Sequence, residues 1–118
     1  MEFFLTEPEV ARLPPADTRL IDLRAEPYPD GKRMRVALDL TPFLQKPYLD
    51  LTLTGPTGEV VAETSIVEPM AWKIELTMHI RKPAASRVTY QLTVILSYPD
   101  LGEIDRRDLT VEIPSTTV

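Results

Sequence analysis

The sequence predicts an all-β fold, an antiparallel seven-stranded sandwich, on three observations. Seven stretches alternate apolar and polar residues with a period of two, and successive strand side chains point to opposite faces of a sheet. Turns that carry proline or glycine separate these stretches, at intervals of roughly 8–15 residues that are typical of sandwiches. No helical pattern lies between them. The chain of 118 residues has the size of one domain.

Residues 1–17 differ from the rest and are expected to form an N-terminal arm or short helix, ahead of a single β-sandwich domain over residues 18–118. Thr6 and Glu9 have the spacing of a capping box, which favours a helix start. A proline pair further on ends anything helical. The pattern therefore predicts a short helix over about 7–13, with a plain extended arm as the alternative.

The first two predicted strands, Arg19–Glu26 and Lys32–Thr41, are joined by a turn that contains an Asp-Gly pair. In the second strand the apolar residues occupy the even positions. Because neighbouring side chains alternate between faces, the even positions are expected to point inward. Arg33 and Arg35 are then expected to point outward.

The third predicted strand, Tyr48–Thr54, carries leucine at alternate positions, and a Gly-Pro-Thr-Gly turn joins it to a fourth strand, Glu59–Val67. Both faces of that fourth strand are mixed, which indicates a short edge strand. Charged residues and prolines normally protect an edge against pairing with another chain. The fourth strand has little beyond Glu63, so we expect it to be an edge that pairs with another chain.

The fifth predicted strand, Trp72–Arg81, shows the clearest alternation, with apolar residues at every even position. The sixth, Arg87–Tyr98, is the longest run. In the seventh, Glu103–Ile113, the apolar parity changes from even at Ile104 to odd further on. A bulge or short break near residues 105–108 would absorb that change.

The residues Tyr90-Gln91-Leu92-Thr93-Val94, near the start of the sixth strand, resemble a tyrosine corner. In immunoglobulin-like and fibronectin type III-like domains, a tyrosine at this place hydrogen-bonds back across the neighbouring corner. The resemblance implies a Greek-key sandwich in which the second and fifth strands are neighbours. The chain lacks the cysteine pair of antibody domains, and its tryptophan stands on the fifth strand. The resemblance is architectural and implies no activity.

Composition argues against several classes of partner. The net charge of −5 disfavours nucleic acid, whose phosphates require a basic surface, and anionic membranes. No apolar run is long enough for a membrane span, and the first residues lack the pattern of a signal peptide. A soluble, cytoplasmic protein is expected. Twelve prolines with no cysteine indicate a thermophilic source or a strong genomic base bias, and the two remain open.

No catalytic motif is evident, so the chain is expected not to be an enzyme and to need no cofactor or metal. The single histidine, His79, falls on an outward position, and no nucleophile or orienting acid stands at a matching spacing. Zinc would require three or four converging ligands. The loop acids are scattered singly, without the alternate spacing of a calcium loop.

Two surfaces are candidates for binding. If the second and fifth strands are neighbours, they form a locally cationic face suited to an acidic partner; the alternative is a solvated face with cross-strand ion pairs. The residues of this face are Arg33, Arg35, Lys73, His79 and Arg81. Phe43, Leu44 and Met70 form an apolar loop patch if they are exposed together, and otherwise they close the end of the sandwich.

The sequence therefore predicts a non-enzymatic β-sandwich module for protein–protein interaction or assembly, including self-association as a homo-oligomer. The alternative is a module that binds carbohydrate or calcium at the loop end. A carboxylate-based hydrolase is the least favoured reading, because it needs two acids held in a cleft.

Overall fold

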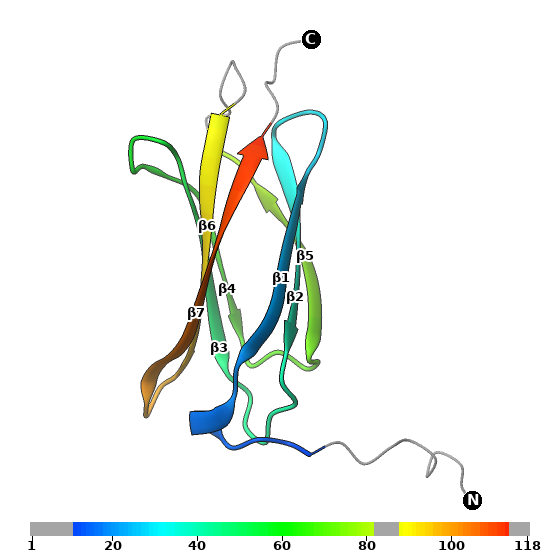
Figure 1. Cartoon of the computed structure of the whole chain (residues 1–118), viewed down its shortest axis with the longest axis vertical. Coiled ribbons are helices and arrows are strands. Elements are labelled where there is room, and N and C mark those ends of the chain that lie inside the picture. Colours follow the sequence, from blue (N-terminus) through cyan, green and yellow to red (C-terminus); the bar gives the residue numbers. More distant parts are fainter. Residues whose placement is uncertain (1–10, 82–87, 114–118) are drawn as a thin grey trace, which may run out of the picture.

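The computed structural model describes residues 11–81 and 88–113, which form a sandwich of two antiparallel sheets (Figure 1). One sheet has three strands in the order β1 (Leu20–Pro27), β2 (Arg33–Leu40) and β5 (Lys73–His79). The other has four in the order β4 (Val60–Val67), β3 (Tyr48–Thr54), β6 (Val88–Tyr98) and β7 (Gly102–Ile113). The seven predicted strands are confirmed, and β2 lies beside β5 as expected.

The core consists of the side chains that each sheet turns toward the other. In β3, Leu49, Leu51 and Leu53 are fully buried. Each lies opposite a buried apolar residue of β6 in the antiparallel register, such as Leu51 opposite Val94. The two-residue period therefore produces an apolar inner face and a polar outer face on these central strands.

The connections gather at the two ends of the sandwich (Figure 1). We call one of them the lower loop end; it carries the short 3₁₀ helix η2 (Pro15–Asp17), the loops 41–47 and 68–72, and the turn 99–101. At the opposite, upper end lie the β1–β2 turn and the β3–β4 turn. Residues from distant parts of the sequence therefore meet at the lower loop end.

Most of the helix expected over 7–13 lies outside the described residues. Of that range, Leu13 is extended and forms a parallel bridge with Phe43. The Leu13 amide donates to the Pro42 carbonyl at 2.9 Å, and the Leu44 amide donates to the Leu13 carbonyl at 2.9 Å. This part of the arm is tied to the second loop by backbone hydrogen bonds.

The predicted irregularity in the last strand is a β-bulge at Ile104, one position before the expected stretch. Ser97 pairs with Glu103, whereas the preceding Leu96 pairs with Asp105, so Ile104 is the extra residue. The bulge turns the odd positions that follow it to the inner face. Arg107, opposite the buried Val94, is one of these.

Tyr90, the residue of the tyrosine-corner resemblance, is buried with 4% of its surface exposed. Burial raises the pKa of its phenol, and the nearby charge of Glu59 adds to this. The segment before it, across which such a corner would bond, includes residues 82–87, which lie outside the described residues.

Candidate interaction surfaces

The outer face of the β1-β2-β5 sheet brings together four of the five residues proposed for a cationic face. The register places Arg33 opposite His79, Arg35 opposite Thr77, and Lys73 opposite Asp39. All lie on the face that β2 turns away from the core, because the even residues between them are buried. The shared face was predicted from parity and the assumed order of strands.

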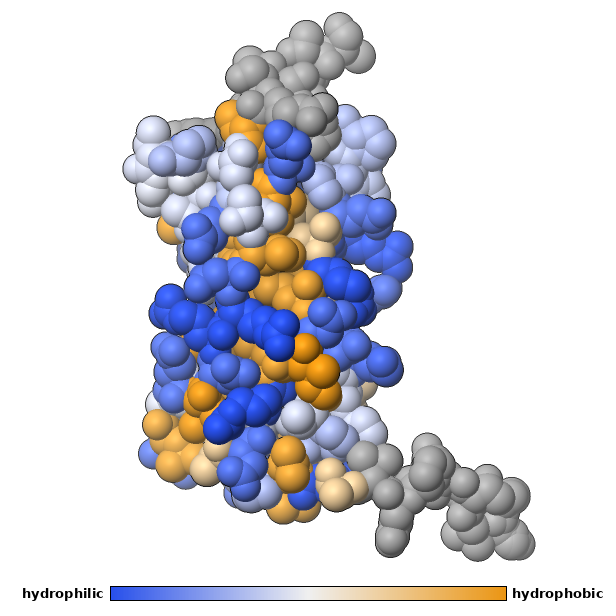
Figure 2. All heavy atoms as spheres, in the orientation of Figure 1, coloured by the Kyte–Doolittle hydropathy of each residue, from blue (hydrophilic) through white to orange (hydrophobic). Residues whose placement is uncertain are grey.

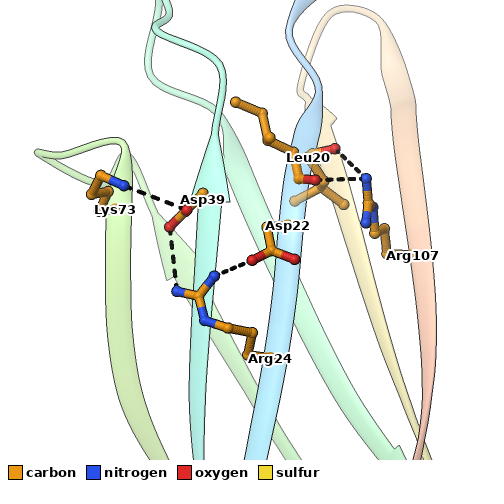
Figure 3. Close-up of polar contacts among 7 residues, drawn as sticks. Leu20, Asp22, Arg24, Asp39, Lys73 and Arg107 are labelled. Atoms are coloured by element: carbon orange, nitrogen blue, oxygen red, sulfur yellow. Dashed lines mark hydrogen bonds and ion pairs between the residues drawn. The ribbon is translucent and has the colours of Figure 1, made fainter.

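Carboxylates from neighbouring strands lie beside these bases. Arg35 Nη2 is 2.7 Å from Glu75 Oε1, and Lys73 Nζ is 3.5 Å from Asp39 Oδ2. Arg24 of β1 bridges Asp22 and Asp39, as Figure 3 shows. The face is therefore a mixed lattice of ion pairs, the solvated arrangement that was the alternative interpretation, and its role in binding a partner stays a prediction.

A shallow depression of about 340 Å³ lies within this lattice. The small side chain of Ala37 borders it, between neighbours with long charged side chains. The depression is lined by Arg24, Ala25, Glu26, Arg35, Ala37 and Glu75. A hydrogen bond from Arg35 to Glu75 raises the pKa of the Arg35 guanidinium.

Arg33 belongs to a separate cluster in the β1–β2 turn. Its guanidinium stacks over Tyr28, 4.2 Å from the ring centroid, and lies 3.0 Å from Asp30 Oδ2. The Lys32 amide donates to Asp30 Oδ1 at 2.9 Å. That backbone hydrogen bond, with the bond from Arg33, lowers the pKa of Asp30. Arg33 thus stabilises the turn from its outward position.

Arg81 does not join the other four residues. Its backbone amide donates to the Val61 carbonyl at 2.7 Å, which brings the end of the fifth strand against β4. A small depression of about 190 Å³ is lined there by Glu59, Val60, Val61 and Arg81. The separation arises because the chain leaves the sheet immediately after Ile80.

The apolar loop patch is exposed in part. Phe43 is buried, with 6% of its surface exposed, and its bridge to Leu13 holds it inside the end of the sandwich, which is the alternative that the sequence left open. Leu44 and Met70 are 62% and 85% exposed. Two further apolar side chains at the lower loop end, Val67 and Leu101, are exposed by 58% and 53%.

Sequence reasoning did not include Val67 and Leu101 in this surface. Val67 stands on the outward parity of β4 at its last position, which is a usable signal in the sequence. Leu101 lies in the turn before β7, and only the folded chain brings that turn close to the second loop.

A larger depression, of about 510 Å³, lies beside these apolar residues. Tyr98 anchors it, because the phenol donates to the Gln45 carbonyl at 2.7 Å and lies 3.2 Å from Thr18 Oγ1. The lining residues are Pro15, Gln45, Lys46, Tyr48, Glu68, Tyr98, Pro99, Asp100 and Leu101. Lys46 Nζ also lies 3.3 Å from Met70 Sδ, which links the depression to the exposed methionine.

Asp105 and Arg107 form a further feature, the β1–β7 clasp, which the sequence did not reveal. The Leu20 amide donates to Asp105 Oδ2 at 2.9 Å. Arg107 Nη2 donates to the carbonyls of Leu20 and Ile21, at 3.2 and 2.8 Å (Figure 3). Figure 2 shows an apolar band along one side of the molecule, with hydrophilic side chains crossing it near mid-height. The clasp therefore joins the two sheets on one long side, at the start of β1.

Within residues 11–81 and 88–113, no group of three or more histidine, aspartate or glutamate residues is arranged to hold a metal ion. His79 is exposed at the end of β5. The same described ranges contain no helix long and apolar enough to cross a membrane.

No protein-family model matches the sequence, and no curated protein does. Solved structures do match the fold. One is a β-glucuronidase of Bifidobacterium dentium complexed with coumarin-3-O-glucuronide, with a TM-score of 0.65 and 15% identity over 84% of this chain. Another is a glycosyl hydrolase family 2 member from Bacteroides cellulosilyticus, with a TM-score of 0.62 and 15% identity over 81% of this chain.

A β-glucuronidase from Ruminococcus gnavus also matches, with a TM-score of 0.56 and 16% identity over 82% of this chain. This chain spans only 19%, 14% and 16% of the lengths of these three proteins, in the order given. At such low identity the likeness shows a shared β-sandwich fold. The matched unit is one small part of each larger enzyme.

Proposed function

We propose that the chain is a non-enzymatic β-sandwich module that docks onto another protein surface through its lower loop end. One observation carries this proposal. Four large apolar side chains, Leu44, Val67, Met70 and Leu101, are each more than half exposed and all lie at that end. Exposed apolar residues gathered in one place are typical of contact surfaces, whereas scattered ones are ordinary.

The comparisons support the modular part of the proposal. In the glycosyl hydrolase family 2 structures, the matched sandwich makes up less than a fifth of the chain. A sandwich of this kind is therefore used as a part of larger proteins. Docking of an apolar loop end against a second domain or subunit would remove its four exposed side chains from water, which is favourable by about 25 cal/mol per Å² of apolar area.

Photo-crosslinking tests the docking surface. A benzophenone amino acid is placed at Met70, and in a matched variant at Val60, an apolar residue 44% exposed on β4 near the upper end. We expect the benzophenone at position 70 to form covalent adducts with a docked protein, and Leu44→Glu to suppress these adducts. We expect no adducts from the benzophenone at position 60. Equal yields of adduct from both positions would contradict the assignment of the lower loop end as the docking surface.

An assay of the purified chain tests its non-enzymatic character. We expect no turnover of a chromogenic β-glucuronide above the buffer rate. Turnover that survives further purification and follows the protein through a sizing column would overturn this part of the proposal.

A ligand-binding module is the second candidate, because the half-buried Tyr48 lines the depression of about 510 Å³ beside Lys46 and Glu68. An aromatic ring with polar neighbours is suited to a sugar. A ligand of the native state raises the melting temperature, so a thermal-shift titration with glucuronic acid, simple glycans and calcium distinguishes this candidate. A rise that Tyr48→Ala abolishes would favour sugar binding.

A further inference from the structure

The methionines of the chain differ sharply in their access to solvent. Met70 is 85% exposed, whereas Met34 and Met78 are 0% and 3% exposed, inside the core. The fourth methionine, Met1, lies outside the described residues. Because an oxidant must reach the sulfur in order to react with it, we expect Met70 to react well before the two core methionines.

The surroundings of Met70 are apolar, with one cation beside the sulfur. Met70 stands in the loop after β4, at the lower loop end, with Leu44, Val67 and Leu101, which are also more than half exposed. Lys46, in the loop before β3, donates from Nζ to Met70 Sδ at 3.3 Å. A thioether is a weak acceptor, so this contact contributes little while the sulfur is reduced.

Oxidation of the sulfur would change both its polarity and its contact with Lys46. A sulfoxide is polar, whereas the thioether that it replaces is apolar. The sulfoxide oxygen is also a stronger acceptor than the thioether sulfur, and the Lys46 ammonium already lies within hydrogen-bond distance of that sulfur. Lys46 would therefore form a charge-assisted hydrogen bond to the new oxygen and hold the oxidised side chain in place.

We propose that Met70 is a site of reversible oxidation by peroxides, and that its sulfoxide, bound by Lys46, lowers the apolar character of the lower loop end. The oxidation depends on the exposure of Met70 and not on any partner. Its consequence for docking rests on the proposed function. A docked partner would have to desolvate the sulfoxide, so oxidation would weaken docking.

The reaction balances with hydrogen peroxide as the oxidant. A lone pair of Met70 Sδ attacks one peroxide oxygen, so that the S–O bond forms and the O–O bond breaks. The electron pair of the broken bond stays on the departing oxygen, which takes the proton of the transferred oxygen and leaves as water. Sulfur loses two electrons and the peroxide gains them. Methionine sulfoxide reductases, which draw two electrons from thiols, reverse the change.

Timed treatment with dilute hydrogen peroxide, followed by peptide mapping with mass spectrometry, tests the site. The mapping measures each methionine separately, so oxidation of Met1 does not obscure that of Met70. We expect the Met70 peptide to gain one oxygen about tenfold faster, or more, than the peptides of Met34 and Met78, which react only when the sandwich opens. Equal rates at the three positions would overturn the proposal.

Hydrophobic-interaction chromatography tests the change in the surface. We expect the oxidised chain to elute earlier than the untreated chain, and a methionine sulfoxide reductase with a thiol to restore the original elution. Met70→Leu keeps an apolar side chain without the sulfur, so it should elute at the same position before and after peroxide. An unchanged elution of the oxidised parent, or an equal change in Met70→Leu, would contradict the proposal.

Carbon NMR of the lysine ε-methylene groups tests the contact with Lys46. We expect oxidation of Met70 to shift one lysine signal, and Lys46→Gln to remove that signal from the spectrum. Lys73, which lies 3.5 Å from Asp39 Oδ2 on the outer face of the smaller sheet, serves as the internal control and should not shift. A Lys46 signal that stays in place after complete oxidation would refute the role of its ammonium.

A benzophenone amino acid at Leu101 separates this proposal from the proposed function. If the lower loop end docks, adducts from position 101 should decrease about fivefold or more on oxidation, because the sulfoxide resists desolvation, and return after reduction. Undiminished adducts would overturn the effect of oxidation on docking. Absence of adducts from the untreated chain would contradict docking itself, whereas the mapping and the elution would still decide the oxidation site.

Discussion

Asp105 and Arg107 show how one extra residue places charges where the alternation would otherwise put apolar side chains. The bulge at Ile104 turns both toward the inner face, at the edge of the sheet. There they bind backbone groups of Leu20 and Ile21, at the point where the β1–β2 pairing is itself irregular. Polar backbone groups that would lack partners are thereby satisfied.

Arg107→Met should destabilise the fold by about 1–2 kcal/mol, because it leaves two carbonyls without their charged donor. Arg106→Met is the matched control. Arg106 is the preceding residue, points outward and forms an exposed ion pair with Glu103 at 3.5 Å, so its loss should cost less than about 0.5 kcal/mol. Urea denaturation of both variants measures the difference. Equal effects would mean that the clasp contributes no more than a surface pair.

At the scale of the strands, the many ion pairs on the outer face of the β1-β2-β5 sheet contribute little to the stability of the fold. Arg35 and Glu75 lie 2.7 Å apart, but their side chains are 52% and 60% exposed. Water screens such pairs, and ordering two long side chains costs entropy. These ion pairs therefore keep the outer face hydrated and define its pattern of charge.

A double-mutant cycle of Arg35→Ala and Glu75→Ala should give almost additive effects on the free energy of unfolding, because water screens this exposed pair. The measurement is the free energy of unfolding at low salt, repeated in 1 M NaCl, where the coupling should decrease further. Strongly non-additive effects that persist in 1 M NaCl would show that water does not screen the pair.

Strand parity predicted the inner residues of β2, β3 and β6 correctly, because each of these strands pairs on both sides and alternates without interruption. Parity could not position the bulge in β7, because a bulged residue is identified only by the register with the neighbouring strand β6. Nor could it predict that Trp72, Ile74 and Leu76 would be half-buried. Their exposure depends on how far β4 lies from β5, a distance between sheets that no local pattern encodes.

The candidate surfaces were predicted less completely than the strands. Arg33, Arg35, Lys73 and His79 were expected on one face and lie there, but the carboxylates beside them depend on the register of neighbouring strands. For Phe43 the sequence left open an exposed patch or closure of the sandwich end, and the residue is buried, where the arm at Leu13 pairs with it. The burial of Phe43 therefore depends on one backbone bridge to Leu13, which is 30 positions earlier in the sequence.

Considered as a whole, the molecule has two unlike long sides and two unlike ends. On one long side the clasp joins β7 to β1 at Leu20 and Ile21, and on the other the Arg81 amide joins the end of the fifth strand to β4 at Val61. The lower loop end exposes apolar side chains, whereas the described turns at the upper end, 28–32 and 55–59, are short and carry proline, glycine and polar residues. These differences give the sandwich a direction.

The clasp should also govern how the molecule moves. Within the described residues, the clasp joins the two sheets at Leu20 and Ile21, and a backbone hydrogen bond from Arg81 joins them near Val61. Thermal fluctuation should separate the sheets more readily on the side of β4 and β5, with the clasp as the hinge. Amide protons of Ile74 and Leu76 should then exchange with deuterium sooner than those of Leu51 and Val94, and Arg107→Met should narrow that difference in protection. Equal protection at these four residues would mean that the sheets separate only when the whole domain unfolds.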